Sequence, residues 1–376
     1  MMRIMANMFD YISWRGDLTF EQSPFNPVDN IIFSHLVYLP LNDIVPGPDV
    51  RGGMSIAGAA EQIAQRQRDD PSFLDDQIVV EAAALVHAMG MAPRYKNCQL
   101  CGFADQTDLI QEKQFCAVSV VIGKKILETS LLVVYRGTDV NLVGWKEDFN
   151  MSLSEPVPSQ REAVNYLERM AGRTKGPLRL AGHSKGGNLA IFAAARCRKE
   201  TKRRIVAVYS NDAPGFHQHF LESQDYQAIH HRIVSFVPQS SLVGMLFKHG
   251  KKAAIVQSTE TGLKQHDLCT WEVMGNDLVR ADELSRESIL VNNILRDWIN
   301  EMENEQRRRF IEAIYTIVTA NHARSISDLS SDWLQSIVSI INSLKNIDEP
   351  TKKLIGKSIG DLFWAARKNI ATLREK

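Results

Sequence analysis

The sequence lacks an excess of charge of one sign, a long apolar run and the pattern of a signal peptide. Its 376 residues include 44 Lys or Arg and 44 Asp or Glu, so no net charge favours nucleic acid or an acidic membrane surface. No apolar run approaches the ~20 residues that a membrane-spanning helix needs, and the start, MMRIMANMFDYISWRGD, lacks the regions of a signal peptide. We therefore expect a cytoplasmic protein with no nucleic-acid partner and no transmembrane segment.

Cysteine is scarce as well. The chain has five cysteines, and this small, odd number suits a reducing compartment better than a disulfide scaffold. Cys98 and Cys101 form a C-x-x-C pair, but no second pair at matching spacing completes a zinc site. We interpret them as ordinary thiols, and we predict no metal at this pair.

The chain divides into three parts by its pattern of apolar residues. Residues 1–112 have helical spacing and loops, residues 113–279 alternate strand-like and helical segments, and residues 280–376 have amphipathic helical spacing without strand signals. Alternating strands and helices predict a mostly parallel sheet with helices on both faces. We therefore expect an N-terminal helical segment that packs on an α/β core, and a C-terminal helical extension.

Two helices are expected within the N-terminal segment. In FNPVDNIIFSHLVYLP an apolar stripe follows Asp29 and Asn30, which we interpret as the start of a helix. The stretch PSFLDDQIVVEAAALVHAMG is typical of an amphipathic helix that ends at Gly90. Between them, VPGPDVRGG is rich in Pro and Gly, which predicts a loop.

One short stretch combines a buried strand, a glycine-rich turn and a helix: LRLAGHSKGGNLAIFAA, residues 178–194. Its centre, GHSKG, has the G-x-S-x-G pattern of a nucleophile elbow. A catalytic serine must lie at the tip of a sharp turn, with glycines that let the strand and helix pass closely and a helix N-terminus that stabilises the oxyanion. The motif predicts that Ser184 is a nucleophile, and the alternative is a purely structural turn.

This elbow resembles that of the α/β hydrolases, and particularly that of the class 3 (fungal-type) lipases. A second segment, VVYRGTDVNLVGWKEDF at residues 133–149, is similar to the lipase segment in which an aromatic residue and R-G-[ST] precede a Trp and an Asp. Together with FDYISWRGDLTFEQSPFNPVDN, YSNDAPGF, PQSSLVGML and QHDLCTW, these motifs resemble a family of uncharacterised bacterial proteins among the lipase-like α/β hydrolases. The resemblance runs from residue 7 to about 275, and it implies an α/β-hydrolase fold.

The resemblance also implies an oxyanion hole. Thr138 corresponds to the oxyanion-hole position on the loop after an early strand, and Trp145 and Asp148 correspond to residues of the helix that follows. The backbone N–H of Lys185 would be the second donor. We interpret the Lys185 side chain as solvated at a helix start, rather than as an attractant for an anionic substrate.

An activated serine needs a histidine within hydrogen-bond reach and a carboxylate that orients the imidazole. The resemblance implies the order serine, acid, histidine, which removes His35 and His87, and it implies a base on the loop after the last core strand. His266 follows the expected strand KAAIVQST, whereas His249 precedes it and His183 adjoins the serine. We therefore predict that His266 is the base. Four further histidines are interpreted as a solvated helical face rather than a metal site: His217, His219, His230 and His231.

The acid departs from the lipase pattern. Fungal-type lipases usually carry an Asp after the strand that corresponds to RIVSFVP, but this sequence has Gln239 and two serines there. One strand earlier, YSND ends at Asp212, and some serine lipases of this superfamily place the acid after that strand. We therefore predict that Asp212 is the acid. The alternatives are a turn-forming role for Asp212 and, as the acid, Asp267 next to His266.

These residues predict a serine hydrolase, a carboxylesterase or a lipase-like enzyme, that cleaves a small-molecule or lipid ester through an acyl-enzyme on Ser184. This chemistry requires no metal or organic cofactor. The alternative is a catalytically weak or inactive binding module, which the missing acid at Gln239 keeps open. We expect the C-terminal helices to be separable from catalysis and to offer a surface for a protein partner.

Overall fold

The structure is a computed structural model of the chain. It describes residues 6–74, 76–123, 130–138, 144, 147, 150, 151, 156–241, 243–245, 248–286, 288 and 289. The chain divides into two compact units. The first contains Met1–Gln106, Phe115–Gly137 and Ser159–Ser285, and the second contains Thr107–Gln114, Thr138–Pro158 and Arg286–Lys376.

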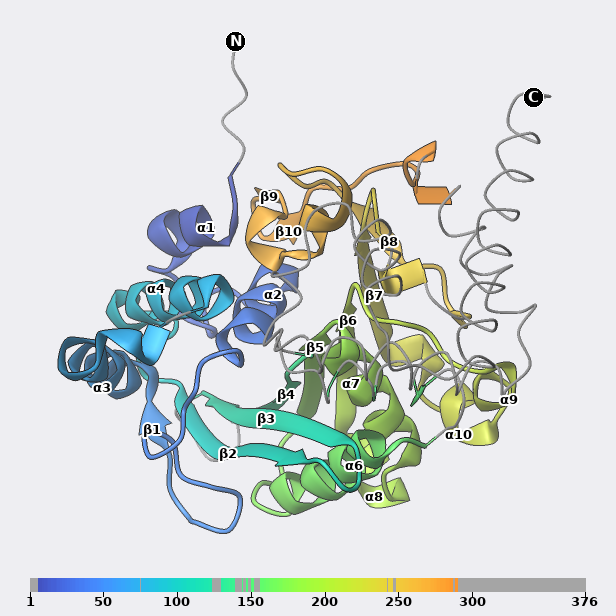
Figure 1. The fold of residues 1–376 in the computed structure, drawn as a ribbon, viewed down its shortest axis with the longest axis horizontal. Coiled ribbons are helices and arrows are strands. Elements are labelled where there is room, and N and C mark those ends of the chain that lie inside the picture. Colours follow the sequence, from blue (N-terminus) through green and yellow to red (C-terminus); the bar gives the residue numbers. More distant parts are fainter. Residues whose placement is uncertain are drawn as a thin grey trace, which may run out of the picture. The chain divides into compact units, whose positions relative to one another are not determined.

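An eight-stranded sheet forms the centre of the first unit, in the order β1-β2-β3-β4-β5-β6-β7-β8 (Figure 1). Its strands are β1 (Met54–Ser55), β2 (Gln99–Asp108), β3 (Lys113–Ile122), β4 (Ser130–Tyr135), β5 (Leu178–His183), β6 (Ile205–Asn211), β7 (Ile233–Pro238) and β8 (Ala254–Val256). The neighbours from β4 to β8 pair in parallel, whereas β1 with β2 and β3 with β4 pair antiparallel. This mixed, mostly parallel sheet with flanking helices confirms the predicted α/β-hydrolase fold class.

The sheet is buried on both faces. Successive side chains of a strand point to opposite faces, and in β4 Leu132 and Val134 belong to one hydrophobic cluster while Leu131, Val133 and Tyr135 belong to another. All six residues of β4 are buried. The continuous apolar run SLLVVY is therefore explained by two packed faces rather than by one.

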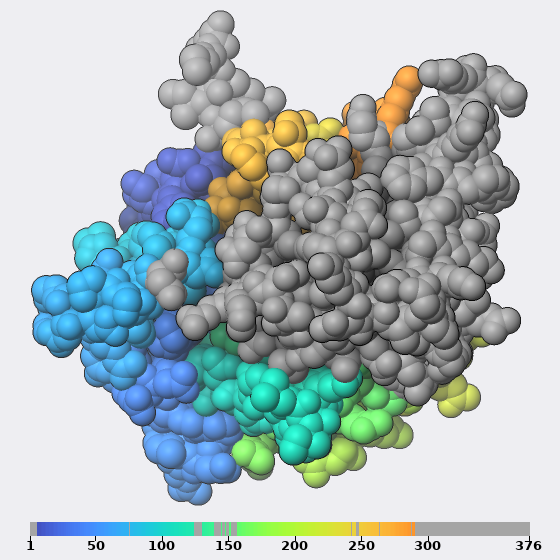
Figure 2. All heavy atoms as spheres, in the orientation of Figure 1, coloured from blue at the N-terminus to red at the C-terminus, as the bar shows by residue number. Residues whose placement is uncertain are grey.

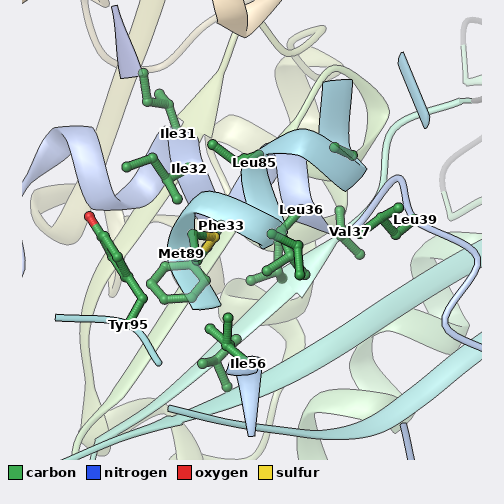
Figure 3. Close-up of a cluster of buried hydrophobic side chains, with 14 of the residues drawn as sticks. Ile31, Ile32, Phe33, Leu36, Val37, Leu39, Ile56, Leu85, Met89 and Tyr95 are labelled. Atoms are coloured by element: carbon green, nitrogen blue, oxygen red, sulfur yellow. The ribbon is translucent and has the colours of Figure 1, made fainter. Parts of the chain in front are cut away.

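Helices from the N-terminal part of the chain cover the first face. They are α1 (Met8–Arg15), α2 (Pro27–Leu36), α3 (Ile56–Asp69) and α4 (Gln77–Met91), with a 3-10 helix at Pro71–Leu74 between the last two. Figure 3 shows side chains of this cluster, among them Phe33, Met89 and Tyr95. The same cluster includes sheet residues such as Leu132 and Ala181, so these helices share a core with the strands.

The start of α2 differs from our expectation. We expected the helix to begin at Asp29 and Asn30, but it begins at Pro27 with Asn26 as the N-cap. The Asn26 side chain accepts hydrogen bonds from Val28 N and Asp29 N, and the Asp29 carboxylate accepts one from Asn26 N at 2.9 Å. Pro27 lies where a missing N–H costs nothing, so this capping box sets the boundary. Asp29 also forms a buried ion pair with Arg94 at 2.6 Å.

The second face is covered by helices that follow β4 in the chain. They are α6 (Pro158–Ala171), α7 (Lys185–Arg196) and the short α9 (Gln218–Leu221) and α10 (Gln224–Gln227). A further helix, α8 (Lys199–Arg204), leads from α7 into β6. Every residue of α7 from Lys185 to Ala195 is buried. A helix that is buried all round lies inside the core, so α7, the helix of the elbow, is firmly held.

Strands also occur where we expected helices and loops alone. Within residues 1–112 the structure forms β1 and β2, in addition to the helices α1 and α3, none of which we predicted. The sequence of β2, QLCGFADQTD, has only one β-branched residue, so composition did not signal a strand. Figure 2 shows blue residues of the N-terminal part of the chain beside teal residues from later in the sequence. The boundaries predicted at residues 112 and 279 stay predictions.

The second unit contains the end of β2, the start of β3 and a segment after β4. Gln114 N donates to Glu147 Oε2 at 3.0 Å, and Asn150 Nδ2 donates to Glu112 Oε2 at 2.8 Å. These hydrogen bonds join the β2–β3 connection and the start of β3 to the segment after β4. The predicted C-terminal helices from residue 290 onward lie outside the described residues, as do Trp145 and Asp148. Among the helices that are described, none has the length and apolar character needed to cross a membrane.

Candidate active site

Ser184 lies at a sharp turn between β5 and α7. Its φ of 54° and ψ of −132° lie in a region that residues with a side chain rarely adopt. A Cβ on Gly182 would lie 2.2 Å from the carbonyl carbon of Gly186, and a Cβ on Gly186 would lie 2.1 Å from the carbonyl oxygen of Tyr135. Both glycines are therefore required by close backbone approach, as in a nucleophile elbow.

The elbow is fixed by its backbone, while the serine side chain is left available. Ser184 N donates to the carbonyl of Asn211 at 2.9 Å, and Gly187 N donates to the carbonyl of Ser184 at 3.0 Å. Ser184 is half-buried, and its side chain does not cap α7. Such strain costs on the order of 1–3 kcal/mol and is found at functional sites, so the turn is consistent with a nucleophile.

Asp212 and His266 are in direct contact. Asp212 Oδ2 lies 2.6 Å from His266 Nδ1. Asp212 directly follows β6, its φ is 46°, and its side chain is 1% exposed. The distance lies in the range that an acid and base of a triad would show, although the catalytic roles of the two residues stay predictions.

The second carboxylate oxygen of Asp212 is held by the loop that follows β7. Ser241 Oγ donates to Asp212 Oδ1 at 2.5 Å, and Gly244 N donates to the same atom at 3.1 Å. A Cβ on Gly244 would lie 2.3 Å from Asp212 Oδ1, so only glycine fits there. This loop lacks a carboxylate of its own, and it instead provides two donors that keep the Asp212 carboxylate in place.

The segment that carries His266 is anchored through its neighbours. His266 ends a 3-10 helix at Gly262–His266, and its side chain is 28% exposed. The Gln265 side chain accepts from Ser240 N and donates to the carbonyl of Glu260, each at 2.7 Å. The buried Trp271 donates through Nε1 to the carbonyl of Gln265 at 2.8 Å. His266 therefore comes from a loop whose backbone is hydrogen-bonded on both sides.

His183 lies beside His266, a relationship that sequence reasoning missed. The two ring centroids are 4.3 Å apart, and the hydroxyl of Tyr38 lies 2.9 Å from His183 Nδ1. Burial, followed by the nearby His266 and His35, lowers the pKa of His183 well below its usual value. His183 is thus neutral at neutral pH, and it adds no positive charge next to the imidazole of His266.

A polar network connects the elbow to α2. Asn30 Nδ2 donates to Asn211 Oδ1 at 2.8 Å, and Asn211 Nδ2 donates to Asn30 Oδ1, Ser34 Oγ and Gly182 O, each at 3.1 Å. Asn30 and Asn211 are fully buried. Asn211 lies between Ser184, which donates to its carbonyl, and Asp212, which follows it in the chain. The sequence signal for this network was the presence of Asn30 and Ser34 within the largely apolar helix segment FNPVDNIIFSHLVYLP.

The two residues predicted to form the oxyanion hole, Thr138 and Lys185, belong to different units. Gly137 belongs to the first unit, and a Cβ there would lie 3.0 Å from Ser184 Cβ. Thr138, the next residue, belongs to the second unit, so its predicted role stays a prediction. Lys185 begins α7, and its side chain is 1% exposed. Our expectation of a solvated side chain is therefore wrong, because the residue is enclosed by the core around α7.

The other candidates from the sequence lie elsewhere. His219, His230 and His231 are exposed and His217 is half-buried. Cys98 and Cys101 are buried free thiols, and burial raises the pKa of Cys98 to about 12. Their thiolates are disfavoured, as expected for ordinary core cysteines. Asp267 accepts from Cys269 N at 2.9 Å within its own turn.

Three comparisons relate the chain to known proteins. The uncharacterized protein alr2406 of Nostoc sp. (strain PCC 7120 / SAG 25.82 / UTEX 2576) is 31% identical over 90 residues, which make up 24% of this chain and 35% of that protein. The chain thus matches about a third of that relative's length. The crystal structure of M37 lipase gives a TM-score of 0.35 at 12% identity, over 58% of this chain and 69% of that one. The sequence model of the Mbeg1-like family matches residues 89–316, more than half of the chain. This match confirms the family resemblance expected from the motifs, and the chain therefore belongs to the Mbeg1-like family.

Proposed function

We propose that this protein is a serine hydrolase that cleaves a carboxylic ester through an acyl-enzyme on Ser184. The observation that carries the proposal is the contact of 2.6 Å between Asp212 Oδ2 and His266 Nδ1. The His266 ring also lies 4.3 Å from that of His183, the residue before the strained Ser184. In an Asp–His pair of this kind the acid fixes the tautomer, so that Nδ1 carries the proton and Nε2 is free to act as a base. Two polar donors on Asp212 Oδ1 support the same role.

The reaction would follow the acyl-transfer sequence of serine hydrolases. Ser184 Oγ attacks the ester carbonyl while His266 Nε2 takes the hydroxyl proton, and Asp212 stabilises the imidazolium. His266 then gives this proton to the leaving alcohol, and a water molecule hydrolyses the acyl-enzyme by the same two proton transfers. The backbone N–H groups of Lys185 and Thr138 would bind the oxyanion, at roughly 3 kcal/mol for each donor.

The proposed substrate is an ester of a small molecule or a lipid, so the enzyme would be a carboxylesterase or lipase-like. The proposal includes a cytoplasmic location, which is supported by the free state of all five cysteines. It also includes the C-terminal helices as a surface for a protein partner. None of these steps calls for a metal or an organic cofactor.

A fluorophosphonate probe tests the proposal directly. We expect the wild-type protein to be labelled in a one-to-one ratio and Ser184→Ala to lose labelling while its circular dichroism spectrum stays unchanged. Ser72→Ala, which changes an exposed serine, is the matched control and should be labelled like the wild type. Labelling that persists in Ser184→Ala would refute the assignment of the nucleophile.

One observation favours a second candidate function, a binding module on a hydrolase fold. Among the described residues no hydrogen bond joins Ser184 Oγ to His266, although catalytic contacts are often loose without substrate. Absence of labelling in a folded wild-type protein, together with no hydrolysis of short- or long-chain p-nitrophenyl esters, would favour this second function.

A further inference from the structure

A second group of reactive side chains lies apart from Ser184, Asp212 and His266. His35, Glu81 and Cys269 each offer one potential ligand atom, and these three atoms all lie within 4.8 Å of one another. His35 is buried, whereas Glu81 and Cys269 are half-buried. We propose that these three residues form a binding site for a divalent transition-metal ion, specifically Zn²⁺.

The best-defined distance in this cluster fits a shared metal ion. His35 Nε2 lies 3.4 Å from Cys269 Sγ. Zn²⁺ binds sulfur at ~2.3 Å and imidazole nitrogen at ~2.0–2.1 Å, and at a tetrahedral angle these lengths put N and S about 3.6 Å apart. The observed separation is within a few tenths of an ångström of that value. The potential ligand atom of Glu81 lies within 4.8 Å of the other two, and a change of glutamate rotamer would bring its carboxylate to a shared ion.

The three ligands come from segments that are otherwise well fixed. His35 lies in the last turn of α2, Glu81 lies in the first half of α4, and Cys269 lies in the 3-10 helix Leu268–Thr270. α2 is held to the sheet by Asn30 and Ser34, and both helices contribute to one hydrophobic cluster. Two helical ligands on packed helices form a rigid base, and the third ligand closes the site from a loop.

The donor set selects the class of ion. An imidazole nitrogen, a thiolate and a carboxylate suit Zn²⁺ and related transition metals, whereas Mg²⁺ and Ca²⁺ prefer sites made entirely of oxygen. On binding, the Cys269 thiol loses its proton to solvent and an Sγ–metal bond replaces the S–H bond, with no change of oxidation state. A water molecule would supply the remaining ligand, since Glu81 and Cys269 are only partly buried.

The site would act on the loop that carries His266. Cys269 follows His266 by three residues, so an ion held by His35 and Glu81 would tie this loop to α2 and α4. The ion is a structural clamp in this proposal, and it takes no part in ester cleavage. Its existence does not depend on the proposed hydrolase activity.

Metal binding is tested with Zn²⁺ and Co²⁺ on the full chain. After chelator treatment and gel filtration, we expect isothermal titration with Zn²⁺ to give about one equivalent per chain and to raise Tm. We expect Co²⁺ to produce visible d–d bands and a near-ultraviolet thiolate-to-metal charge-transfer band. Cys269→Ser should abolish the charge-transfer band and lower Zn²⁺ affinity at least tenfold.

Matched variants separate metal ligation from folding. Cys197→Ser, which keeps a donor for the Ala194 carbonyl, and the exposed Glu61→Gln should bind both ions like the wild type. If Cys269→Ser does not fold, Glu81→Gln on the half-buried position should still weaken Zn²⁺ binding in a folded protein. Wild-type protein that takes up no Zn²⁺ at micromolar concentration, or Co²⁺ spectra without the thiolate band, would overturn the proposal. Unchanged binding in a folded Cys269→Ser or Glu81→Gln variant would overturn it as well.

Discussion

Asn30 and Asn211, which are 181 residues apart in the chain, exchange two side-chain hydrogen bonds in the core at 2.8 and 3.1 Å. The pair joins α2 to the strand that ends at Asp212. The backbone of Asn211 also accepts the hydrogen bond from Ser184 N. Through Asn211, α2 is therefore connected to Ser184 by a hydrogen bond and to Asp212 by the chain itself.

Asn30→Ala should destabilise the fold. It removes both hydrogen bonds between Asn30 and the buried Asn211 amide, which costs about 1–3 kcal/mol. Urea unfolding monitored by circular dichroism would measure the loss, and the exposed Asn97→Ala should stay within about 0.5 kcal/mol of the wild type. Equal stability of Asn30→Ala and Asn97→Ala would contradict the role of this network.

Asp212→Asn should keep the fold and lower kcat by orders of magnitude, up to ~10⁴-fold, because an amide favours the wrong tautomer of His266. Asp267→Asn is the matched control, since the Asp267 carboxylate caps Cys269 N within its own turn. Steady-state hydrolysis of a p-nitrophenyl ester compares the two variants. Normal turnover in Asp212→Asn with a loss in Asp267→Asn would transfer the acid role to Asp267.

Gly244→Ala should reduce activity although Gly244 has no reactive group. Its new Cβ would overlap Asp212 Oδ1, at 2.3 Å, and displace the carboxylate from His266. A loss of kcat with little change in KM is expected, together with reduced stability of about 1–3 kcal/mol from overpacking. At Gly47 the nearest atom would be 3.9 Å away, so Gly47→Ala should behave like the wild type in both assays.

Acid should destabilise the protein through His183. Burial lowers the pKa of His183 in the folded state well below 6.5. Below about pH 6.5, His183 is therefore protonated in the unfolded chain while it stays neutral in the folded protein. The contribution of the neutral His183 to the free energy of unfolding is complete above pH 6.5. It is lost as the pH falls from 6.5 toward the pKa of His183 in the folded protein. His183→Gln should show a smaller loss of unfolding free energy between about pH 8 and about pH 5 than the wild type. The exposed His219→Gln should lose as much as the wild type, and an identical pH profile for His183→Gln would argue against this assignment.

Positions defined by chain order and strand ends could be predicted from the sequence. The elbow at Ser184 follows from glycines next to a buried strand. The contact between Asp212 and His266 joins the two residues that the resemblance to lipases, together with elimination, indicated as acid and base, and their roles stay predictions. The support of Asp212 by Ser241 and Gly244 was beyond prediction, because it depends on a loop closing back over the neighbouring strand. A hydroxyl and a backbone N–H have no sequence pattern that identifies their target.

Burial was the other quantity that local patterns did not predict. Lys185 resembles a solvated helix start, but α7 is enclosed on every side, and its position in the layers decides the exposure. Conversely, β2 lacks strand-like composition and is stabilised by its place next to β3 in the sheet. The pairing of Asn30 with Asn211 also depends on a long-range contact, which a single sequence does not show.

The loop after β7 carries the supports of Asp212 and no carboxylate of its own. Under the proposed mechanism, this separates the proton chemistry from the loop that usually supplies it in fungal-type lipases. Substitutions at Ser241 and Gly244, where the contacts to Asp212 are made, should therefore reduce activity, whereas Gln239→Ala in the same loop should leave it unchanged. A search for hydrolases that demands an acidic residue after β7 would overlook such proteins, whereas one that accepts an acid after β6 would retrieve them.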